Sequence, residues 1–390
     1  MFNIIIIIII IIIFIIIIMN RKKEYFNEKQ IIKIKISYNK IKKQPPINNN
    51  NTTHIIEYTF AQHDLEDSTY ADIYKLLLTA DKNSNIVFDI MLHTKLSGYF
   101  IHIEKGEHTI EKFNNKLFFN NNQFDKFIKI VKNNQKKIKG NFNQIFVLGG
   151  HCNGWYCYSD DNIVNFDYIC ETFKKNKLHF DLITFDSCYT STIDLVYEFY
   201  KYSDYIIAHQ TYVNYEGFNS PNLNIIFNTK YSFDIKVIML AYEYIDRSII
   251  EPAHASISVY KCNVFDNFLN LLKLHYKDIR KIMASNEVKK YYTDLCTRWL
   301  GNCMGRTECS ESVCNNMVDL HKLLKLFGNK KLHELLDKSV FFLRNGIPLD
   351  PKYFNNKIKF GGVNIIIDFK KMNNKERLYY KKLKFYKDFY

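Results

Sequence analysis

The sequence predicts an α/β protein with a mostly parallel central sheet flanked by helices and a mainly helical C-terminal extension. Short, strongly apolar segments alternate with helical patterns of about ten to fifteen residues, which is typical of βαβ units. The composition is also that of a globular protein, because 47% of the 390 residues are hydrophobic and 24% are charged. These values exclude a wholly disordered, collagen-like or multi-span membrane protein.

The expected elements follow one another along the chain in this alternating order. We expect strands at His54–Ala61, Ile86–Leu92, Gln144–Leu148, His179–Phe185, Tyr205–Ala208, His254–Tyr260 and Val363–Phe369. We expect helices at Asp64–Thr79, Phe124–Ile138, Ile163–Lys175, Thr192–Tyr202, Phe233–Ser248, Val264–Met283 and Leu320–Leu336.

Composition shifts divide the chain into five segments. Residues 1–19 are hydrophobic, residues 20–53 form a basic linker that contains Pro45-Pro46, and residues 54–275 form the main α/β domain. Residues 276–350 are expected to be a helical extension containing cysteines, and residues 351–390 a basic C-terminal tail.

The net charge of +14 comes from 54 basic and 40 acidic residues. Up to Tyr58 the chain has nine bases and three acids, and from Pro351 onward it has eleven bases and three acids. The remainder has as many bases as acids, so the positive charge belongs to the two ends. This distribution argues against a nucleic-acid-binding core, whose basic face would be part of the fold.

The segment Ile4–Met19 is an uninterrupted apolar run. As a helix it would span about 24 Å, which is shorter than the hydrocarbon core of about 30 Å. Arg21, Lys22 and Lys23 follow the run, so the positive-inside rule favours a short signal anchor with the body on the cytoplasmic side. The alternative is a codon-repeat expansion without a membrane role, in an AT-rich genome, and then the protein is expected to be cytoplasmic.

The nine cysteines are not arranged as a disulfide scaffold, since their number is odd and the chain is long. Cys296, Cys303, Cys309 and Cys314 cluster, but no pair has the C-x₂-C spacing of common zinc sites. We therefore expect thiols and no metal. The sequence indicates no cofactor and no oligomeric state.

Two polar segments follow neighbouring predicted strands. The first reads Gly149-Gly150-His151-Cys152-Asn153-Gly154-Trp155 and the second Asp186-Ser187-Cys188-Tyr189. Ligands of open parallel sheets bind at the carboxyl ends of the strands, where these segments lie. A thiol and an imidazole at such a place are the minimum for thiol nucleophilic catalysis, with the Cys188 N–H as an oxyanion donor.

These segments resemble the clostripain-type cysteine peptidases, which share a caspase-like fold with caspases, gingipains, legumain and separase. The resemblance covers Ile55–Leu272 and depends mainly on His-x-x-Gly-Trp at His151–Trp155 and Phe-Asp-x-Cys at Phe185–Cys188. Further matches are Gln62–Glu66, Asp194–Glu198, Ala208–Gln210 and Glu216-Gly217.

The resemblance implies that His151 is the general acid/base and Cys188 the nucleophile of a cysteine endopeptidase. It also implies peptide or protein substrates cut after Arg or Lys, for which Asp186 and Glu216 are the candidate carboxylates. Activation by self-cleavage is expected at Lys174–Lys177. The resemblance leaves calcium open, although no motif indicates it.

The main departure from the family pattern is Cys152, where a glycine is usual and where the backbone N–H would contribute to the oxyanion hole. A side chain there would be costly if the position requires a positive φ. His209 also replaces a usual serine, and Gln62-His63 replaces Asp-Asn. An alternative function is therefore a catalytically inactive relative that acts as a membrane-tethered binding module. A nucleotide-binding protein is disfavoured because no phosphate-binding loop motif is present.

Overall fold

The computed structural model describes residues 51–390 except for 62–64, 81–83, 96, 114–120, 160–161, 211–212, 214–217, 219–222, 230, 248–255, 287–316, 346–360 and 367–371. The hydrophobic segment Ile4–Met19 and the linker that follows it lie outside these residues, as do Cys296, Cys303, Cys309 and Cys314. Within the described residues, no helix is both long and apolar enough to cross a bilayer.

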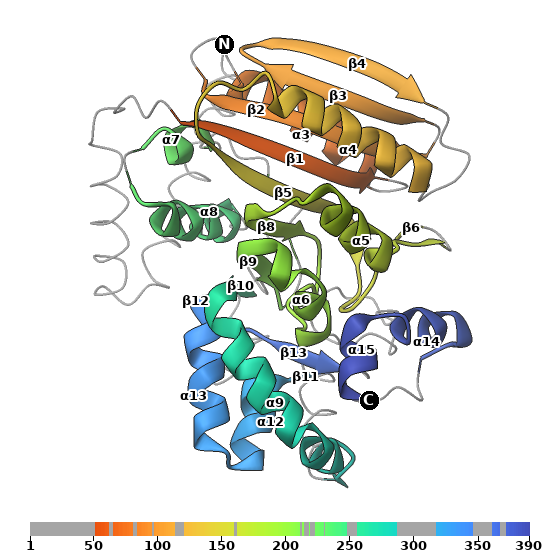
Figure 1. The fold of residues 1–390 in the computed structure, drawn as a ribbon, viewed down its shortest axis with the longest axis vertical. Coiled ribbons are helices and arrows are strands. Elements are labelled where there is room, and N and C mark those ends of the chain that lie inside the picture. The colour runs from red at the N-terminus through yellow and green to blue at the C-terminus, as the bar shows by residue number, and fades with distance from the viewer. Residues whose placement is uncertain are drawn as a thin grey trace, which may run out of the picture. The chain divides into compact units, whose positions relative to one another are not determined.

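The centre of the fold is a mixed sheet in the order β12-β10-β9-β8-β5-β1-β2-β3-β4 (Figure 1). The middle strands are parallel: β9 (Ser203–His209), β8 (Phe180–Asp186), β5 (Phe142–Cys152), β1 (Thr52–Ala61) and β2 (Ile86–Thr94). Antiparallel strands extend both sides: β10 (Ser256–Lys261), β12 (Val340–Asn345), β3 (Gly98–Glu104) and β4 (Glu107–Phe113). The predicted fold class, a mostly parallel sheet flanked by helices, is confirmed.

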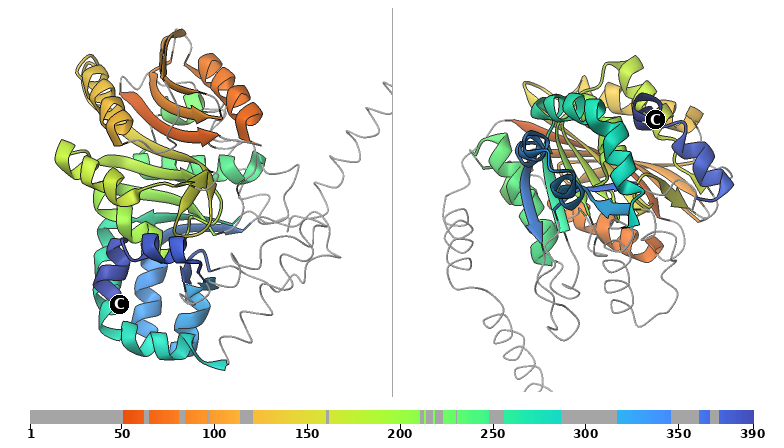
Figure 2. Two further views of the ribbon diagram at one scale, coloured as in Figure 1. Left: turned by 90° about the vertical axis from the view of Figure 1, so that its right-hand side faces the viewer. Right: turned by 90° about the horizontal axis from the view of Figure 1, so that it is seen from below.

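Helices cover both faces of this sheet, as Figure 2 shows. One face carries α4 (Asn121–Gln135), α5 (Phe166–Asn176), α6 (Ile193–Phe199), the 3₁₀ turn η2 (Tyr200–Tyr202) and α9 (Cys262–Met283). The other carries α3 (Glu66–Thr79), α7 (Leu223–Phe227) and α8 (Phe233–Arg247). Because side chains alternate along a strand, Phe146, Leu148 and Phe185 point to the first face and belong to the hydrophobic core formed with α4, α5 and α9.

The antiparallel hairpin β3–β4 was not predicted from the sequence. Its two-residue loop is Lys105-Gly106, and both residues have positive φ, 51° and 78°. This is the backbone requirement of a type I′ turn, which twists in the same sense as the flanking strands. Glycine is usual at the second loop position, but lysine at the first gives no turn signal in the sequence.

The C-terminal residues are integrated with the main fold in the described part of the chain. A second, two-stranded sheet joins β11 (Met317–Asp319) to β13 (Asn364–Ile366). The predicted helix Leu320–Leu336 is instead two helices, α12 (Leu320–Phe327) and α13 (Lys330–Ser339), because Gly328 adopts φ 76° and ends the first. Two further helices, α14 (Asn374–Tyr380) and α15 (Lys384–Phe389), complete the chain. The five-segment division of the chain stays a prediction. Residues of the predicted extension and of the predicted tail nevertheless contribute to the two sheets and to the hydrophobic core.

Candidate active site

The two predicted catalytic residues follow adjacent parallel strands. Strands β5 and β8 pair in a register that places Gly149 opposite Asp186. His151 and Cys188 each lie two residues further along their chains, at the edge where the parallel strands end. We call this edge the carboxyl edge. The structure therefore brings both residues to one place in the sheet, as expected from the order of their motifs.

His151 lies in the first strand of a tight hairpin formed by β5 and β6 (Cys157–Ser159), which in turn pairs with β7 (Asn162–Ile163). The hairpin closes through Gly154-Trp155, where Asn153 N–H donates to Tyr156 O at 2.8 Å. Gly154 has φ 76°, which matches the first loop position of a type II′ turn. His151 faces Tyr158 across the hairpin, with ring centroids 5.9 Å apart and planes at 21°. This stacking restricts the orientation of the imidazole.

Cys152 is not a thiol, contrary to the expectation from the cysteine count. It forms a disulfide with Cys157, the residue directly opposite it in the hairpin. Other described cysteines, Cys170, Cys188 and Cys262, do carry thiols. The disulfide removes Cys152 as a competing nucleophile and fixes the hairpin that holds His151.

The backbone at Cys152 carries no positive-φ penalty. Positive φ falls instead on the glycines either side, Gly150 at 131° and Gly154 at 76°. Because Asn153 and Tyr156 form the hydrogen-bonded pair next to the turn, the Cys152–Cys157 pair is of the non-hydrogen-bonded kind. The Cys152 N–H consequently points away from β6, which leaves it compatible with the predicted oxyanion role.

Cys188 lies in a constrained loop after β8. Ser187 Oγ donates to Leu148 O at 3.3 Å, and Thr190 Oγ1 donates to Ser187 O at 3.1 Å. Tyr189 has φ 57°, a conformation that costs a residue with a side chain about 1–2 kcal/mol. The strain immediately after Cys188 is held by this hydrogen bonding, as is common where a fold orients a functional side chain.

The Cys188 thiol is half-buried against the backbone that follows β9. Val213 N–H donates to Cys188 Sγ at 3.4 Å, and the thiol lies 4.0 Å from Val213 O. Burial raises the pKa of the Cys188 thiol to about 11; the Val213 N–H opposes this rise and the Asp186 carboxylate adds to it. The thiol is therefore protonated at neutral pH in the unliganded protein.

Asp186, two residues before Cys188, is half-buried at the carboxyl edge. Its Oδ2 accepts a hydrogen bond from Phe218 N–H at 2.7 Å. Nearby Glu57 is buried on β1, which raises its pKa to about 8, with Thr59 lowering and Asp186 raising the value. Asp186 therefore lies close to the Glu57 carboxyl, whose neutral form is favoured by burial. Glu216, the second predicted specificity carboxylate, lies outside the described residues.

His209 ends the next parallel strand, β9, but its chemistry differs from that of His151. It is 2% exposed and packs edge-on against Tyr244 at 5.0 Å. Burial lowers the pKa of His209 to about 3, so its imidazole stays neutral. Its backbone is used structurally, since Ser191 N–H donates to His209 O at 2.8 Å. His209 is therefore a core residue, and its backbone connects the loops after β8 and β9.

The C-terminal segment forms hydrogen bonds with the loops after β8 and β9, which was not predicted from the sequence. Asn364 N–H donates to Ser191 O at 2.8 Å, and Gly362 N–H donates to Gln210 Oε1 at 2.6 Å. Gln210 Nε2 in turn donates to Asp319 Oδ2 at 3.1 Å. Gln210 lay in the recognised motif Ala208–Gln210, but nothing in the sequence indicated its partners more than a hundred residues away.

Metal-ligating atoms come together elsewhere in the described residues, on α12 and α13, where His321, His333 and Asp337 form one group. The carboxyl edge itself presents a thiol, an imidazole and backbone N–H groups. These groups suit acyl transfer to a thiol nucleophile.

Comparisons with known proteins agree with this arrangement. The sequence profile of the clostripain family matches residues 119–325, which include His151 and Cys188. An inactive zymogen C11 protease from Parabacteroides distasonis has a similar structure, with a TM-score of 0.62 and 17% identity over 87% of this chain and 99% of that chain. A secreted C11 cysteine protease from Bacteroides thetaiotaomicron in complex with an irreversible peptide inhibitor gives a TM-score of 0.61 and 15% identity over 87% and 98%.

At these identities the structural likenesses show the fold, and no curated protein matches the sequence. The family assignment depends on the profile, which spans more than half of the chain. The chain belongs to the clostripain family of cysteine peptidases.

Proposed function

We propose that the protein is a cysteine endopeptidase that uses Cys188 as nucleophile and His151 as general acid/base to cut peptide bonds after Arg or Lys. The observation that carries the proposal is the β5–β8 register, which brings the two residues to one edge of the sheet. Peptide and protein substrates follow from the family. The preference for basic residues depends on Asp186.

The high pKa of Cys188 determines how the reaction starts. A protonated thiol is a poor nucleophile, so His151 takes the Sγ proton as the sulfur attacks the scissile carbonyl carbon. The carbonyl oxygen becomes an oxyanion, for which the Cys152 and Cys188 N–H groups are the candidate donors. His151 then gives its proton to the leaving amine, and water hydrolyses the thioester to regenerate the thiol.

The pH dependence of thiol alkylation tests this starting state. We expect the iodoacetamide rate at Cys188 to rise about tenfold per pH unit from about pH 7 to about pH 10, because only the thiolate reacts. A small-molecule thiol of ordinary pKa is the control, and its rate should level off earlier. A Cys188 rate that is already high and constant near pH 7 would indicate a preformed thiolate–imidazolium pair and would contradict the account.

Specificity is tested at Asp186. We expect Asp186→Asn to lower kcat/KM for Arg substrates by about 30-fold to about 4,000-fold, because a buried charge pair is worth about 2–5 kcal/mol. The change keeps an acceptor for the Phe218 N–H, so matched substrates with a neutral residue before the cut should lose much less. Asp204→Asn, on an exposed residue at the start of β9, is the control. An equal loss on both substrates would mean that Asp186 only supports the loop.

Self-cleavage at Lys174–Lys177 stays a prediction. The structure places these residues at the end of α5, where Lys177 is the left-handed C-cap and Lys174, Lys175 and Lys177 are exposed. Because the last turn of a helix opens more easily than its middle, cleavage there requires only local unfolding. Incubated wild type should give two fragments and Cys188→Ala none. Identical intact bands from the two proteins would remove the idea.

The signal anchor at Ile4–Met19 is a separate proposal about location and does not bear on the chemistry. Its support is the apolar run followed by three basic residues. A catalytically inactive relative remains the alternative function. It is distinguished by covalent labelling of Cys188, which that alternative does not predict.

A further inference from the structure

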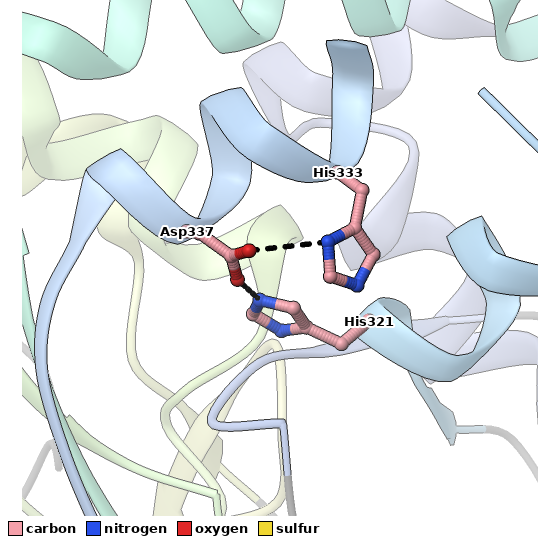
Figure 3. A group of neighbouring side chains, drawn as sticks. All are labelled: His321, His333 and Asp337. Atoms are coloured by element: carbon pink, nitrogen blue, oxygen red, sulfur yellow. Dashed lines mark hydrogen bonds and ion pairs between the residues drawn. The ribbon is translucent and has the colours of Figure 1, made fainter. Parts of the chain in front are cut away.

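The consecutive helices α12 and α13 bring two imidazoles and one carboxylate together. His321 lies at the start of α12, and His333 and Asp337 lie one turn apart on α13 (Figure 3). His321 Nε2 is 2.7 Å from Asp337 Oδ1, and His333 Nδ1 is 3.1 Å from Asp337 Oδ2. The three ligand atoms all lie within 4.8 Å of one another.

From this convergence we infer that His321, His333 and Asp337 form a binding site for a divalent transition-metal ion, with Zn²⁺ the best match. Imidazole nitrogens and one carboxylate oxygen are ligands that zinc accepts at about 2.0–2.2 Å. On a tetrahedral ion such atoms are separated by about 3.4 Å, so the two imidazole–carboxylate distances would each lengthen by less than about 1 Å to admit an ion. Calcium and magnesium prefer sets made of oxygen alone, which this site does not offer.

The burial of the group also suits a metal site. The side chains of His321 and His333 are 12% and 23% exposed, whereas Asp337 is 56% exposed. The rings pack edge to face with centroids 5.1 Å apart, which fixes their orientation. Asp337 therefore marks the side from which an ion and a completing water would enter.

The far ring nitrogens, His321 Nδ1 and His333 Nε2, are buried and have no hydrogen-bond partner among the described residues. Each ring therefore makes its polar contact with Asp337 through its other nitrogen. In the unliganded arrangement one proton from each ring joins the imidazoles to the carboxylate. A zinc ion would replace these protons and bind the two ring nitrogens and one oxygen of the Asp337 carboxylate.

The position gives the ion a structural role. Helix α13 packs against α9 and leads directly into β12, the strand next to β10 in the main sheet. Helix α12 follows β11, whose Asp319 accepts hydrogen bonds from Gln210 and from Gly361 N–H. Joining α12 to α13 would stabilise the segment that supports the loop after β9. The inference does not depend on the proposed peptidase activity.

The test is zinc binding by the full-length chain, carrying Cys188→Ala to prevent self-cleavage. The accessible thiols are alkylated so that cysteines cannot contribute ligands, and Zn²⁺ is titrated against a chromogenic chelator while the thermal midpoint is followed. We expect the parent to bind zinc with a rise in midpoint. His333→Gln and Asp337→Asn should each lower the affinity at least about tenfold and remove the rise.

His179→Gln is the matched control, because His179 pairs with Asp204 at 3.0 Å on the surface and belongs to no group of potential metal ligands in the described part of the chain. It should keep the affinity of the parent. A purely structural ion-pair role would lower the midpoints of His333→Gln and Asp337→Asn without zinc and leave the zinc-dependent rise unchanged. That result, or a parent that does not bind zinc, would overturn the inference.

Discussion

Replacement of Cys188 by alanine is expected to lower hydrolysis of Arg-containing peptides by at least about 10⁴-fold. The estimate follows from the loss of a covalent nucleophile, after which only binding and oxyanion stabilisation remain. The fold should tolerate the change, because the thiol is half-buried and its hydrogen bonds within the described residues are with Val213 backbone atoms. The measurement is the steady-state rate on fluorogenic peptides, with the thermal midpoint determined alongside.

Cys262→Ala is the control for this change, since it removes a thiol at the start of α9, away from the carboxyl edge. It should retain activity. If Cys188→Ala kept activity within about tenfold of wild type, another residue would be the nucleophile and the proposed function would be wrong.

Replacement of Tyr380 by alanine is expected to lower the free energy of unfolding by about 3–5 kcal/mol. Tyr380 is fully buried, and removal of a large buried ring leaves a cavity of that cost. Its hydroxyl donates to Asp194 on α6, and its ring meets Trp155 edge-on at 5.2 Å. Tyr380 thus joins the C-terminal helix α14 to α6 and to the turn of the His151 hairpin.

The hydrogen bond to Asp194 accounts for part of this loss. Burial raises the pKa of Asp194 to about 7, and the Tyr380 hydroxyl and the Ile366 N–H counteract the rise. Tyr380→Phe should cost about 1–3 kcal/mol, because it leaves that carboxyl with one hydrogen bond fewer. Chemical denaturation measures both changes.

Leu378→Ala is the control on the same helix, because Leu378 is 63% exposed and should change stability by less than about 0.5 kcal/mol. If Tyr380→Ala were as mild as this control, the last helices would be peripheral to the domain. The division of residues 351–390 as a tail would then be the better description.

The sequence was most informative where a pattern is local. The alternation of short apolar segments and helices predicted the parallel strands from β1 to β9, since burial on both faces gives each strand a continuous apolar run. The same reasoning missed β4, whose residues are nearly all exposed and carry no apolar signal. It merged α12 and α13, because their apolar spacing continues past Gly328.

The candidate site likewise has features that the sequence predicts and features that it does not. The position of His151 and Cys188 at one edge of the sheet could be predicted, because each follows a recognisable strand and the two strands are neighbours. The Cys152–Cys157 disulfide depends on the hairpin that places the two residues opposite each other, which spacing alone does not specify. The hydrogen bonds from Asn364 and Gly362 to the loops after β8 and β9 are contacts between distant segments, and one sequence gives no information about such pairs.

Covalent labelling tests the central claim most directly. An Arg- or Lys-directed acyloxymethyl ketone is added to the folded wild type and to Cys188→Ala, and the modified peptide is identified by mass spectrometry. We expect a single adduct at Cys188 in the wild type, and none in Cys188→Ala. An adduct on another residue, or a folded wild type that takes up no probe, would contradict the assignment of Cys188 as the nucleophile of a peptidase.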